Sequence, residues 1–222
     1  MRVLITGTSS GIGRATARLF LENGHEVFGI DRNPSTINHS EYIHYIADIR
    51  RAEILPDIED VEILINNAGT VDPDESIDTN LRGYINVTEK YAYQKAIKAV
   101  VNVCSLSARA GLENGYYSAS QGGRVAYSRH LTIVLGKRYG ATVNCISPGA
   151  VLTNLEPELY TNPRLLKAVA KENILNKWIM PEEIALWIYF VAVENHSMTG
   201  QDILIDAGEE ANYNFIEEEA KS

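Results

Sequence analysis

The stretch Thr6-Gly7-Thr8-Ser9-Ser10-Gly11-Ile12-Gly13 decides the fold that we predict for this chain of 222 residues. It follows a short, partly β-branched apolar run at 3–5 and leads into a segment with helical periodicity at 14–21. A strand, a glycine turn and a helix N-terminus in this order form an anion site, because free N–H groups and the helix dipole point at a bound phosphate. The alternative is a glycine-rich turn that binds no ligand.

The glycines of this stretch have different expected tasks. Gly7 allows a tight turn, Gly11 leaves room for a pyrophosphate to approach, and Gly13 lets the helix pack near the strand. Their intervals of four and two residues do not match G-x-G-x-x-G, and no Gly-Lys-Ser/Thr follows that would indicate a P-loop.

Composition limits the class of protein. The net charge of −9 and the pI of about 5.1 argue against a surface for nucleic acid or for an anionic membrane. The longest apolar run, 184–193, is too short to span a bilayer, and a strand that starts directly after Met1 leaves no room for a signal peptide. We expect a cytoplasmic protein in which Cys104 and Cys145 are buried, reduced thiols, and no metal site is predicted.

Strand and helix signals alternate along the chain. This pattern predicts a single-domain, Rossmann-type α/β fold over 1–210, a doubly wound parallel sheet of about seven strands with helices on both faces, and an acidic tail at 211–222. Ligands of such sheets lie at the carboxyl ends of the strands. The expected strands are 3–5, 26–30, 42–46, 61–65, 100–104, 142–146 (ended by Ser147-Pro148-Gly149) and 203–205. The expected helices are 14–21, 74–95, 117–139 and one that starts at Pro181. Helix-compatible pieces lie in 154–178, and only a short helix is expected near Pro56.

Asp31 ends the second expected strand, eighteen residues after Gly13. An acid at this place hydrogen-bonds a ribose 2′-OH, whereas a 2′-phosphate would face like charge, so Asp31 favours NAD over NADP. Arg32 follows it and would soften that preference, and the alternative for Asp31 is a solvated acid in a turn.

Several segments together resemble the short-chain dehydrogenase/reductase family over nearly the whole chain. The first stretch resembles its T-G-x-x-x-G-x-G signature, and Asn66-Asn67-Ala68-Gly69 resembles its N-N-A-G segment. Ser147-Pro148-Gly149 and 199–201 extend the similarity. The resemblance implies a nicotinamide cofactor held by Gly7, Ser9, Ser10, Gly11, Ile12, Gly13, Asp31, Arg32, Asp48, Ile49, Asn67, Ala68, Gly69, Tyr117, Gln121, Pro148, Gly149, Val151 and Thr153, with Asp48 near the adenine.

The same resemblance implies a catalytic group. Asn80, Ser105 and Tyr117 match the family's Asn, Ser and Tyr, with Ser107 as an alternative to Ser105. Gln121 stands where the family's Y-x-x-x-K motif has lysine, so the charge that lowers the tyrosine pKa is missing. Arg124 lies on roughly the same helix face and is interpreted as a surface or interface residue, with replacement of the missing charge as the alternative.

The implied activity is hydride transfer between the cofactor and a small alcohol or its ketone, with Tyr117 as acid and base. The missing lysine keeps open a catalytically weak NAD-binding protein, and the fold also allows an isomerase, epimerase or dehydratase with bound NAD. Only ten residues separate Gly69 from Asn80, fewer than we expect of the family. A helix at 184–193 that is apolar all round predicts a homodimer or homotetramer, unless the chain's own segment after Thr153 covers it.

Overall fold

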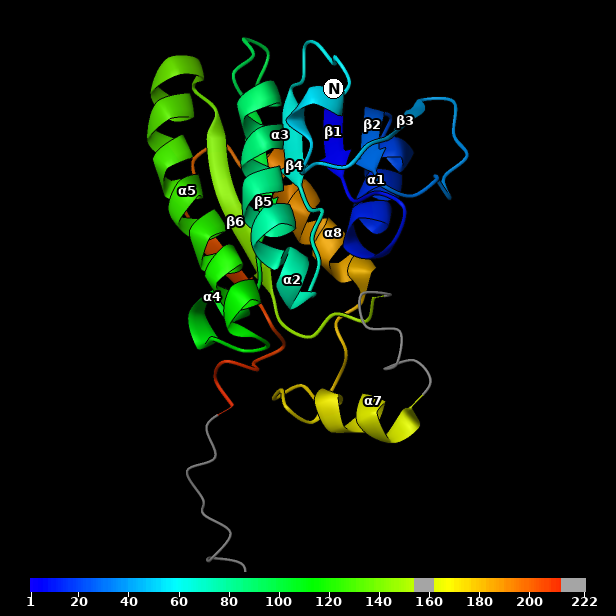
Figure 1. Cartoon of the computed structure of the whole chain (residues 1–222), viewed down its shortest axis with the longest axis vertical. Helices are drawn as coiled ribbons and strands as arrows, with labels where there is room; N and C mark the ends of the chain where they lie inside the picture. The colour runs from blue at the N-terminus through cyan, green and yellow to red at the C-terminus, as the bar shows by residue number, and fades with distance from the viewer. Residues whose placement is uncertain (154–161, 213–222) are drawn as a thin grey trace, which may run out of the picture.

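The computed structural model describes residues 1–153 and 162–212, and these build one parallel sheet. The strand order is β3-β2-β1-β4-β5-β6-β7, so the direction of winding reverses between β1 and β4 (Figure 1). The strands are β1 (Arg2–Thr6), β2 (Glu26–Asp31), β3 (Tyr42–Ile46), β4 (Ile63–Asn66), β5 (Ala99–Val103), β6 (Thr142–Pro148) and β7 (Asp202–Ile205).

Helices cover both faces of the sheet. On one face, α1 (Gly11–Glu22) packs beside α8 (Pro181–Tyr189), and Phe20 and Ile188 belong to the core beneath them. On the other face, the core contains Tyr84 of α3 (Tyr84–Tyr91) and Leu131 of α5 (Gly115–Tyr139) (Figure 1). The shorter segments are η1 (Ala52–Ile54), α2 (Pro73–Ser76), the π-helical η2 (Ile77–Gly83), α4 (Ser107–Ala110), α7 (Pro163–Ala170) and the π-helical η3 (Phe190–Glu194).

This architecture confirms the predicted fold class, and most element boundaries differ from the prediction by one or two residues. The predicted helix 117–139 begins earlier, at Gly115, because the Asn114 side chain accepts a hydrogen bond from the N–H of Tyr117 and caps the helix. It ends at Tyr139, where Gly140 adopts the left-handed conformation at φ +70°, as a glycine C-cap does. Only the short η1 lies near Pro56, and Cys104 and Cys145 are buried and free, as predicted.

Two predicted boundaries are wrong. The helix predicted to reach residue 95 ends at Tyr91, because the following turn uses the Gln94 side chain to bond the N–H of Val61 and the carbonyl of Ile58. The sixth strand does not break at Ser147-Pro148-Gly149 but continues through Pro148. Pro148 is the last residue of β6, and its carbonyl oxygen accepts the N–H of Leu106. Because the strand ends at Pro148, the backbone N–H that proline lacks is not needed for further strand pairing.

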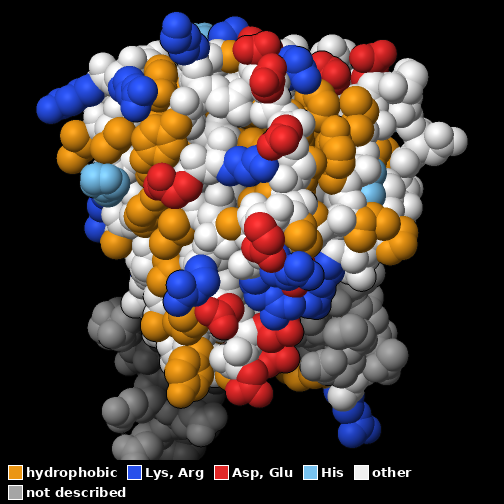
Figure 2. Space-filling model, turned by 45° about the horizontal axis from the view of Figure 1, so that its top comes forward, with side chains coloured by type: hydrophobic (Ala, Val, Ile, Leu, Met, Phe, Trp, Pro, Cys, Tyr) orange, Lys and Arg blue, Asp and Glu red, His pale blue; other side chains and the backbone are white. Residues whose placement is uncertain are grey.

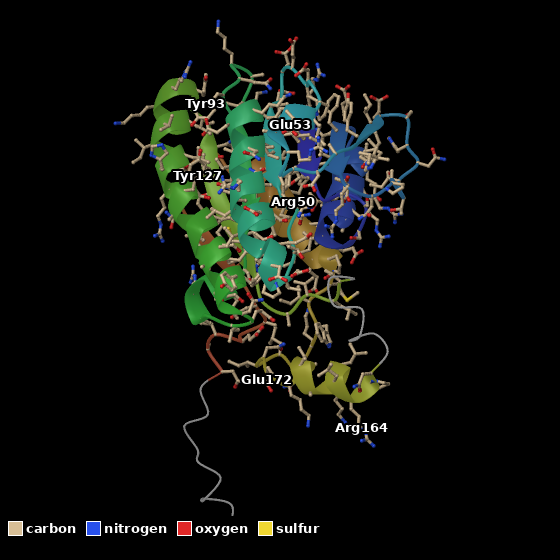
Figure 3. All side chains as sticks on the ribbon, viewed as in Figure 1. Arg50, Glu53, Tyr93, Tyr127, Arg164 and Glu172 are labelled. Carbon is tan, nitrogen blue, oxygen red and sulfur yellow. The ribbon has the colours of Figure 1, made fainter. Side chains whose placement is uncertain are left out.

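The segment between β6 and α8 extends beyond the sheet. Helix α7 lies below the carboxyl ends of the strands in Figure 1, and Arg164 at its start and Glu172 just after it are labelled in Figure 3. The predicted features at 154–161, and nearly all of the predicted acidic tail, lie outside the described residues. Within 1–153 and 162–212, no helix is long and apolar enough to cross a membrane.

The surface has both charge signs side by side. Figure 2 shows Lys and Arg side chains next to Asp and Glu side chains over much of the face in view. A distinct apolar strip lies along the outer side of α8 and η3, where Leu186, Trp187 and Phe190 are 60%, 44% and 49% exposed. The part of the chain that the structure describes therefore leaves one side of this apolar helix uncovered, as the sequence predicts.

Candidate functional site

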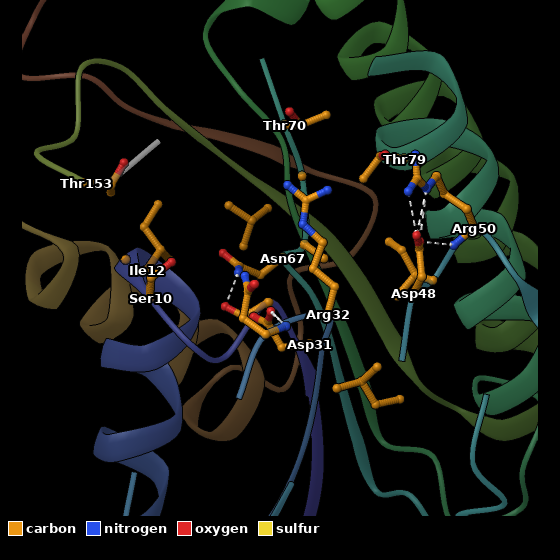
Figure 4. Close-up of a pocket in the computed structure, with 18 of the residues that line it drawn as sticks. Ser10, Ile12, Asp31, Arg32, Asp48, Arg50, Asn67, Thr70, Thr79 and Thr153 are labelled. Carbon is orange, nitrogen blue, oxygen red and sulfur yellow. Dashed lines mark hydrogen bonds and ion pairs between the residues drawn. The ribbon is translucent and has the colours of Figure 1, made fainter. Parts of the chain in front are cut away.

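A cleft of about 380 Å³ opens at the carboxyl ends of the strands, at the reversal point between β1 and β4. Figure 4 shows side chains from the glycine turn, the ends of β2, β3 and β4 and the loops after them facing this space. Of the residues predicted to bind a cofactor, those that line it are Gly7, Ser10, Gly11, Ile12, Asp31, Arg32, Asp48, Ile49, Asn67, Ala68, Gly69, Tyr117, Gln121 and Thr153.

The glycine turn is closely packed against β4. Gly7 has φ +77°, and a Cβ atom at Gly13 would lie 2.1 Å from the carbonyl oxygen of Gly7. The Asn67 side-chain amide donates to the carbonyl oxygens of Thr6, at 3.0 Å, and Gly7, at 3.3 Å. Glycine is therefore required at 13 for the helix to approach the strand, and Asn67 fixes the turn from the neighbouring strand.

The N-terminus of α1 opens onto the cleft. Its N-cap residue, Ser10, is extended and makes no side-chain capping bond, so the N–H groups of the first turn are available to an anion. A Cβ atom at Gly11 would lie 3.3 Å from Cγ2 of Thr153, which also lines the cleft. Backbone donors beside a position with no side chain fit the diphosphate of a dinucleotide.

Asp31 is held in a fixed orientation at the edge of the cleft. Its Oδ2 accepts the N–H of Ser9 at 2.9 Å, and its Oδ1 accepts the N–H of Asn33 at 2.8 Å. Each carboxylate oxygen keeps a second lone pair for a hydroxyl donor. Ser9 does not itself line the cleft, so its contribution is to position Asp31.

Asp48 binds a residue that the sequence analysis missed. The Arg50 guanidinium donates to both carboxylate oxygens of Asp48, with Nη2 to Oδ2 at 2.6 Å, as the dashed lines in Figure 4 show. These bonds hold the pKa of Asp48 below its usual range. In the sequence, Asp48 and Arg50 are two residues apart and so lie in one turn. This spacing is the feature from which the ion pair could have been predicted.

Tyr117 is in the first turn of α5 and is 9% exposed, with its side chain in the lining of the cleft. Burial raises its pKa above the ordinary value, whereas its hydrogen bond with Ser105 and the positive charge of Arg124 lower that pKa. Ser105 therefore lies close enough to Tyr117 to act on its pKa. Ser107, the alternative, is buried and donates its N–H to the Ser105 hydroxyl oxygen at 3.1 Å.

Gln121 lies one helical turn after Tyr117 and also lines the cleft. It is 3% exposed, and its Oε1 atom has no hydrogen-bond partner among the described residues. A buried, unpaired amide oxygen is costly unless a ligand satisfies it. This atom fits a hydroxyl donor such as that of a ribose.

The interpretation of Arg124 as a surface or interface residue is wrong. Arg124 is 1% exposed and lines the cleft, with Nη2 donating to the Asn66 carbonyl at 2.8 Å. Its guanidinium carbon lies 5.0 Å from the ring centroid of Tyr84. Helical periodicity located the correct face, but only the packing of α5 against the end of β4 shows that this face is interior.

Both the oxygen and the nitrogen of the Asn80 side-chain amide form hydrogen bonds within the protein. Its Oδ1 accepts the N–H of Thr70 at 2.8 Å, and its Nδ2 donates to the Thr70 carbonyl at 2.8 Å and to the Ser120 hydroxyl at 3.1 Å. It is fully buried and does not line the cleft, so it orders the loop after β4 from behind.

Several predicted residues surround the cleft without lining it, and several lining residues were not predicted. No group of His, Cys, Asp and Glu suited to a metal is found in the described part of the chain. The predicted residues outside the lining are Ser9, Gly13, Asn80, Ser105, Pro148, Gly149 and Val151, and the lining residues that were missed are Ile30, Asn33, Ala47, Arg50, Thr70, Thr79, Val103 and Cys104.

Comparison with known proteins identifies the family of this chain. Residues 7–210 match the family model described as Enoyl-(Acyl carrier protein) reductase. The chain is 30% identical to D-xylose 1-dehydrogenase of Caulobacter vibrioides, covering 93% of this chain and 94% of the relative. It is 29% identical to the 3-oxoacyl-[acyl-carrier-protein] reductase FabG of Thermotoga maritima, covering 92% and 96%.

Solved structures of dehydrogenases and oxidoreductases have the same fold as this chain. A 4-hydroxyisoleucine dehydrogenase mutant complexed with NADH and succinate superposes with a TM-score of 0.84 at 27% identity, covering 96% of this chain and all of that one. An oxidoreductase of Burkholderia thailandensis reaches a TM-score of 0.86 at 26% identity, covering 95% and 93%. The fold and the cleft define a Rossmann-type oxidoreductase. The chain belongs to the short-chain dehydrogenase/reductase family.

Proposed function

We propose that this protein is an NAD(H)-dependent oxidoreductase that interconverts a small alcohol and its carbonyl compound. The observation that carries the proposal is the convergence of Tyr117 and Gln121 at the same cleft as the glycine turn and Asp31, with Ser105 close enough to Tyr117 to act on its pKa. The cleft thus has dinucleotide-binding features at one end and a proton-donating hydroxyl at the other.

The cofactor would be held along the cleft by features from the start of α1, the end of β2 and helix α5. The N–H groups at the start of α1 would bind the diphosphate, and Asp31 would accept the hydroxyl of the adenosine ribose. Gln121 Oε1, unpaired among the described residues, would accept a hydroxyl of the second ribose. The nicotinamide ring supplies and accepts the hydride when bound.

Tyr117 would move the proton. Its hydroxyl would donate a proton to the substrate oxygen during carbonyl reduction, and its deprotonated, tyrosinate form would accept the hydroxyl proton of the substrate during alcohol oxidation. Ser105 would hold the same oxygen, because it follows the end of β5 and lies close enough to Tyr117 to lower its pKa. Asn80 would keep the loop at Thr70 in place behind these groups.

Arg124 would supply part of the charge that a lysine at 121 provides in the family pattern. Its guanidinium lines the same cleft as Tyr117, and its charge lowers the Tyr117 pKa. Burial of Tyr117 is the larger influence, so we expect an enzyme whose oxidation reaction is slow at neutral pH.

A second candidate is an NAD-binding protein of this fold with little catalysis. The uncharged Gln121 favours it, because the proton-transfer machinery is weakened while the cofactor features are intact. Turnover separates the two candidates.

The test is direct titration of purified protein with NADH and NADPH, followed by a panel of alcohols with NAD⁺ and of ketones and aldoses with NADH. Turnover that Tyr117→Phe abolishes, with NADH binding retained, supports the enzyme. Binding without turnover supports the second candidate, and binding of neither cofactor contradicts both.

A further inference from the structure

The side chain of Glu75 links two arginines at the edge of the cleft. Its Oε2 lies 3.3 Å from Nη1 of Arg32, and its Oε1 lies 3.0 Å from Nη1 of Arg50. Arg32 follows β2, Arg50 follows β3, and Glu75 belongs to α2, so the three residues join three separate parts of the chain. Both arginines line the cleft.

Local sequence places Glu75 there. The segment from Gly69 to Asn80 is short, and Asp72 caps α2 by accepting the N–H of Asp74 at 2.9 Å, with Pro73 as the first helical residue. The helix therefore begins directly after the loop at the end of β4, and its first turn lies beside the ends of β2 and β3. In this way the short connection brings an acid to the adenosine end of the cleft.

The two arginines are held to different degrees. Arg50 also donates to both oxygens of Asp48, and its side chain is 32% exposed, so it is fixed from two sides. The Arg32 side chain is 59% exposed, and Glu75 is the acid that it pairs with among the described residues. Figure 4 shows the Arg32 side chain extending upward from beside Asp31, with the Asp48–Arg50 pair to its right.

An arginine in this position has a defined chemical consequence. A guanidinium beside the adenosine ribose binds a 2′-phosphate through charge-assisted, bidentate hydrogen bonds. Glu75 competes for that guanidinium and adds a third carboxylate to those of Asp31 and Asp48, against the two charges of Arg32 and Arg50. Both effects disfavour the binding of a dianionic 2′-phosphate and do not affect the binding of a neutral ribose 2′-hydroxyl.

We propose that Glu75, fixed by Arg50, determines cofactor selectivity by withholding Arg32 from the 2′-phosphate of NADP(H). The inference rests on the proposed nicotinamide cofactor, and it assigns to Glu75 a positioning task that Asp31 alone does not perform. Asp31 accepts the ribose hydroxyl directly, whereas Glu75 acts through the arginine next to it.

The experiment measures dissociation constants of NADH and NADPH by fluorescence titration for wild type, Glu75→Gln and Asp78→Asn. Asp78 is the matched control, because it is an exposed acid on the adjoining η2 and its partner is Arg82. In Glu75→Gln we expect NADPH to bind about three- to tenfold more tightly, a range set by the modest strength of exposed ion pairs, with NADH changed less than about twofold. Asp78→Asn should change neither constant beyond about twofold.

Two arginine variants test whether Arg32 is the group released. In Glu75→Gln/Arg32→Ala the gain in NADPH affinity should disappear, and Arg32→Ala alone should leave NADPH binding close to that of wild type. A Glu75→Gln protein with an unchanged NADPH/NADH ratio overturns the inference, as does a gain that survives in the double variant or appears equally in Asp78→Asn. If Arg32→Ala alone weakens NADPH severalfold, Arg32 is already free to bind phosphate, and the inference is again wrong. Wild-type protein that binds neither dinucleotide contradicts the proposed function itself, which is a different outcome.

Discussion

Arg124 donates a hydrogen bond of 2.8 Å to the backbone carbonyl of Asn66, so the middle of α5 is fastened to the end of β4. The same guanidinium lies over the Tyr84 ring and in the lining of the cleft. A charge this deeply buried is costly unless it is paired, and the carbonyl oxygens of Asn66 and Ala68 and the Tyr84 ring face supply part of that pairing, whereas Nε has no partner among the described residues. Arg124 thus serves both the structure and the electrostatics around Tyr117.

The Gln121→Lys variant should oxidise alcohols faster at neutral pH. An added ammonium one helical turn from Tyr117 should lower the tyrosine pKa by about 1 unit or more. In wild type, burial raises the pKa of Tyr117 above its ordinary value, so little of the tyrosinate that oxidation needs is present at pH 7. The measurement is a pH–rate profile of both proteins with one accepted alcohol.

For wild type, we expect the rate of alcohol oxidation to rise with pH into the alkaline range. For Gln121→Lys, we expect the same rise in oxidation rate to occur at lower pH. Carbonyl reduction uses the protonated tyrosine and should fall only above the Tyr117 pKa. A wild-type oxidation limb near pH 7 that Gln121→Lys leaves unmoved would contradict this prediction.

Arg124→Ala should both destabilise the protein and raise the Tyr117 pKa. Loss of the buried guanidinium removes its hydrogen bond to the Asn66 carbonyl and leaves a space beside Tyr84, at a cost of about 2–4 kcal/mol in the free energy of unfolding. The exposed Arg129 of the same helix gives the control, and Arg129→Ala should cost less than about 0.5 kcal/mol. Urea unfolding measures the first effect, and the alkaline limb of oxidation measures the second.

Asp31→Ala should weaken NADH binding and reduce the difference in affinity between NADH and NADPH. The Asp31 carboxylate is fixed by the N–H groups of Ser9 and Asn33, so its removal deletes a positioned acceptor and one negative charge. We expect NADH to bind about tenfold more weakly, as loss of a hydrogen bond to a charged group implies. Equal or tighter binding of NADPH by wild type would show that the preference for NAD is wrong.

Gly13→Ala should disrupt the glycine turn. Its Cβ atom would lie 2.1 Å from the Gly7 carbonyl oxygen, so helix and strand must separate, at about 1–3 kcal/mol of stability. Gly122→Ala is the control, because a Cβ atom there has its nearest neighbour at 3.9 Å. Thermal unfolding and NADH titration should show losses for Gly13→Ala alone, and equal behaviour of the two variants would contradict the close packing.

The apolar strip of α8 and η3 predicts a homo-oligomer. Trp187 and Phe190 lie with ring centroids 6.3 Å apart and are 44% and 49% exposed, in line with a surface that a second copy covers. Trp187→Glu should shift sedimentation at micromolar concentration toward monomer, whereas Leu175→Glu, at an exposed site outside the strip, should not. A wild-type protein that sediments as a monomer refutes the prediction.

The sequence by itself determined the layered fold and most of its strands. The apolar run at 3–5 and the valine-rich segment at 100–104 predict buried strands, and the glycine turn between the first strand and a helix indicates the parallel α/β class. The same local signals located Asp31 and Asn67, because in a parallel sheet the residues after each strand meet at one edge. Tyr117 and Gln121 were located by the resemblance to the family's Y-x-x-x-K motif.

Tertiary structure decided which of these residues act on the cleft and which support it. Asn80 follows the motif pattern, yet its amide is used up by Thr70 and Ser120. Helical periodicity gives the face on which Arg124 lies but not what covers that face, and only the packing of α5 on β4 makes this arginine interior. The pairing of Glu75 with Arg32 and Arg50 joins residues 43 and 25 positions apart, and such contacts depend on the folded path of the chain rather than on any local pattern.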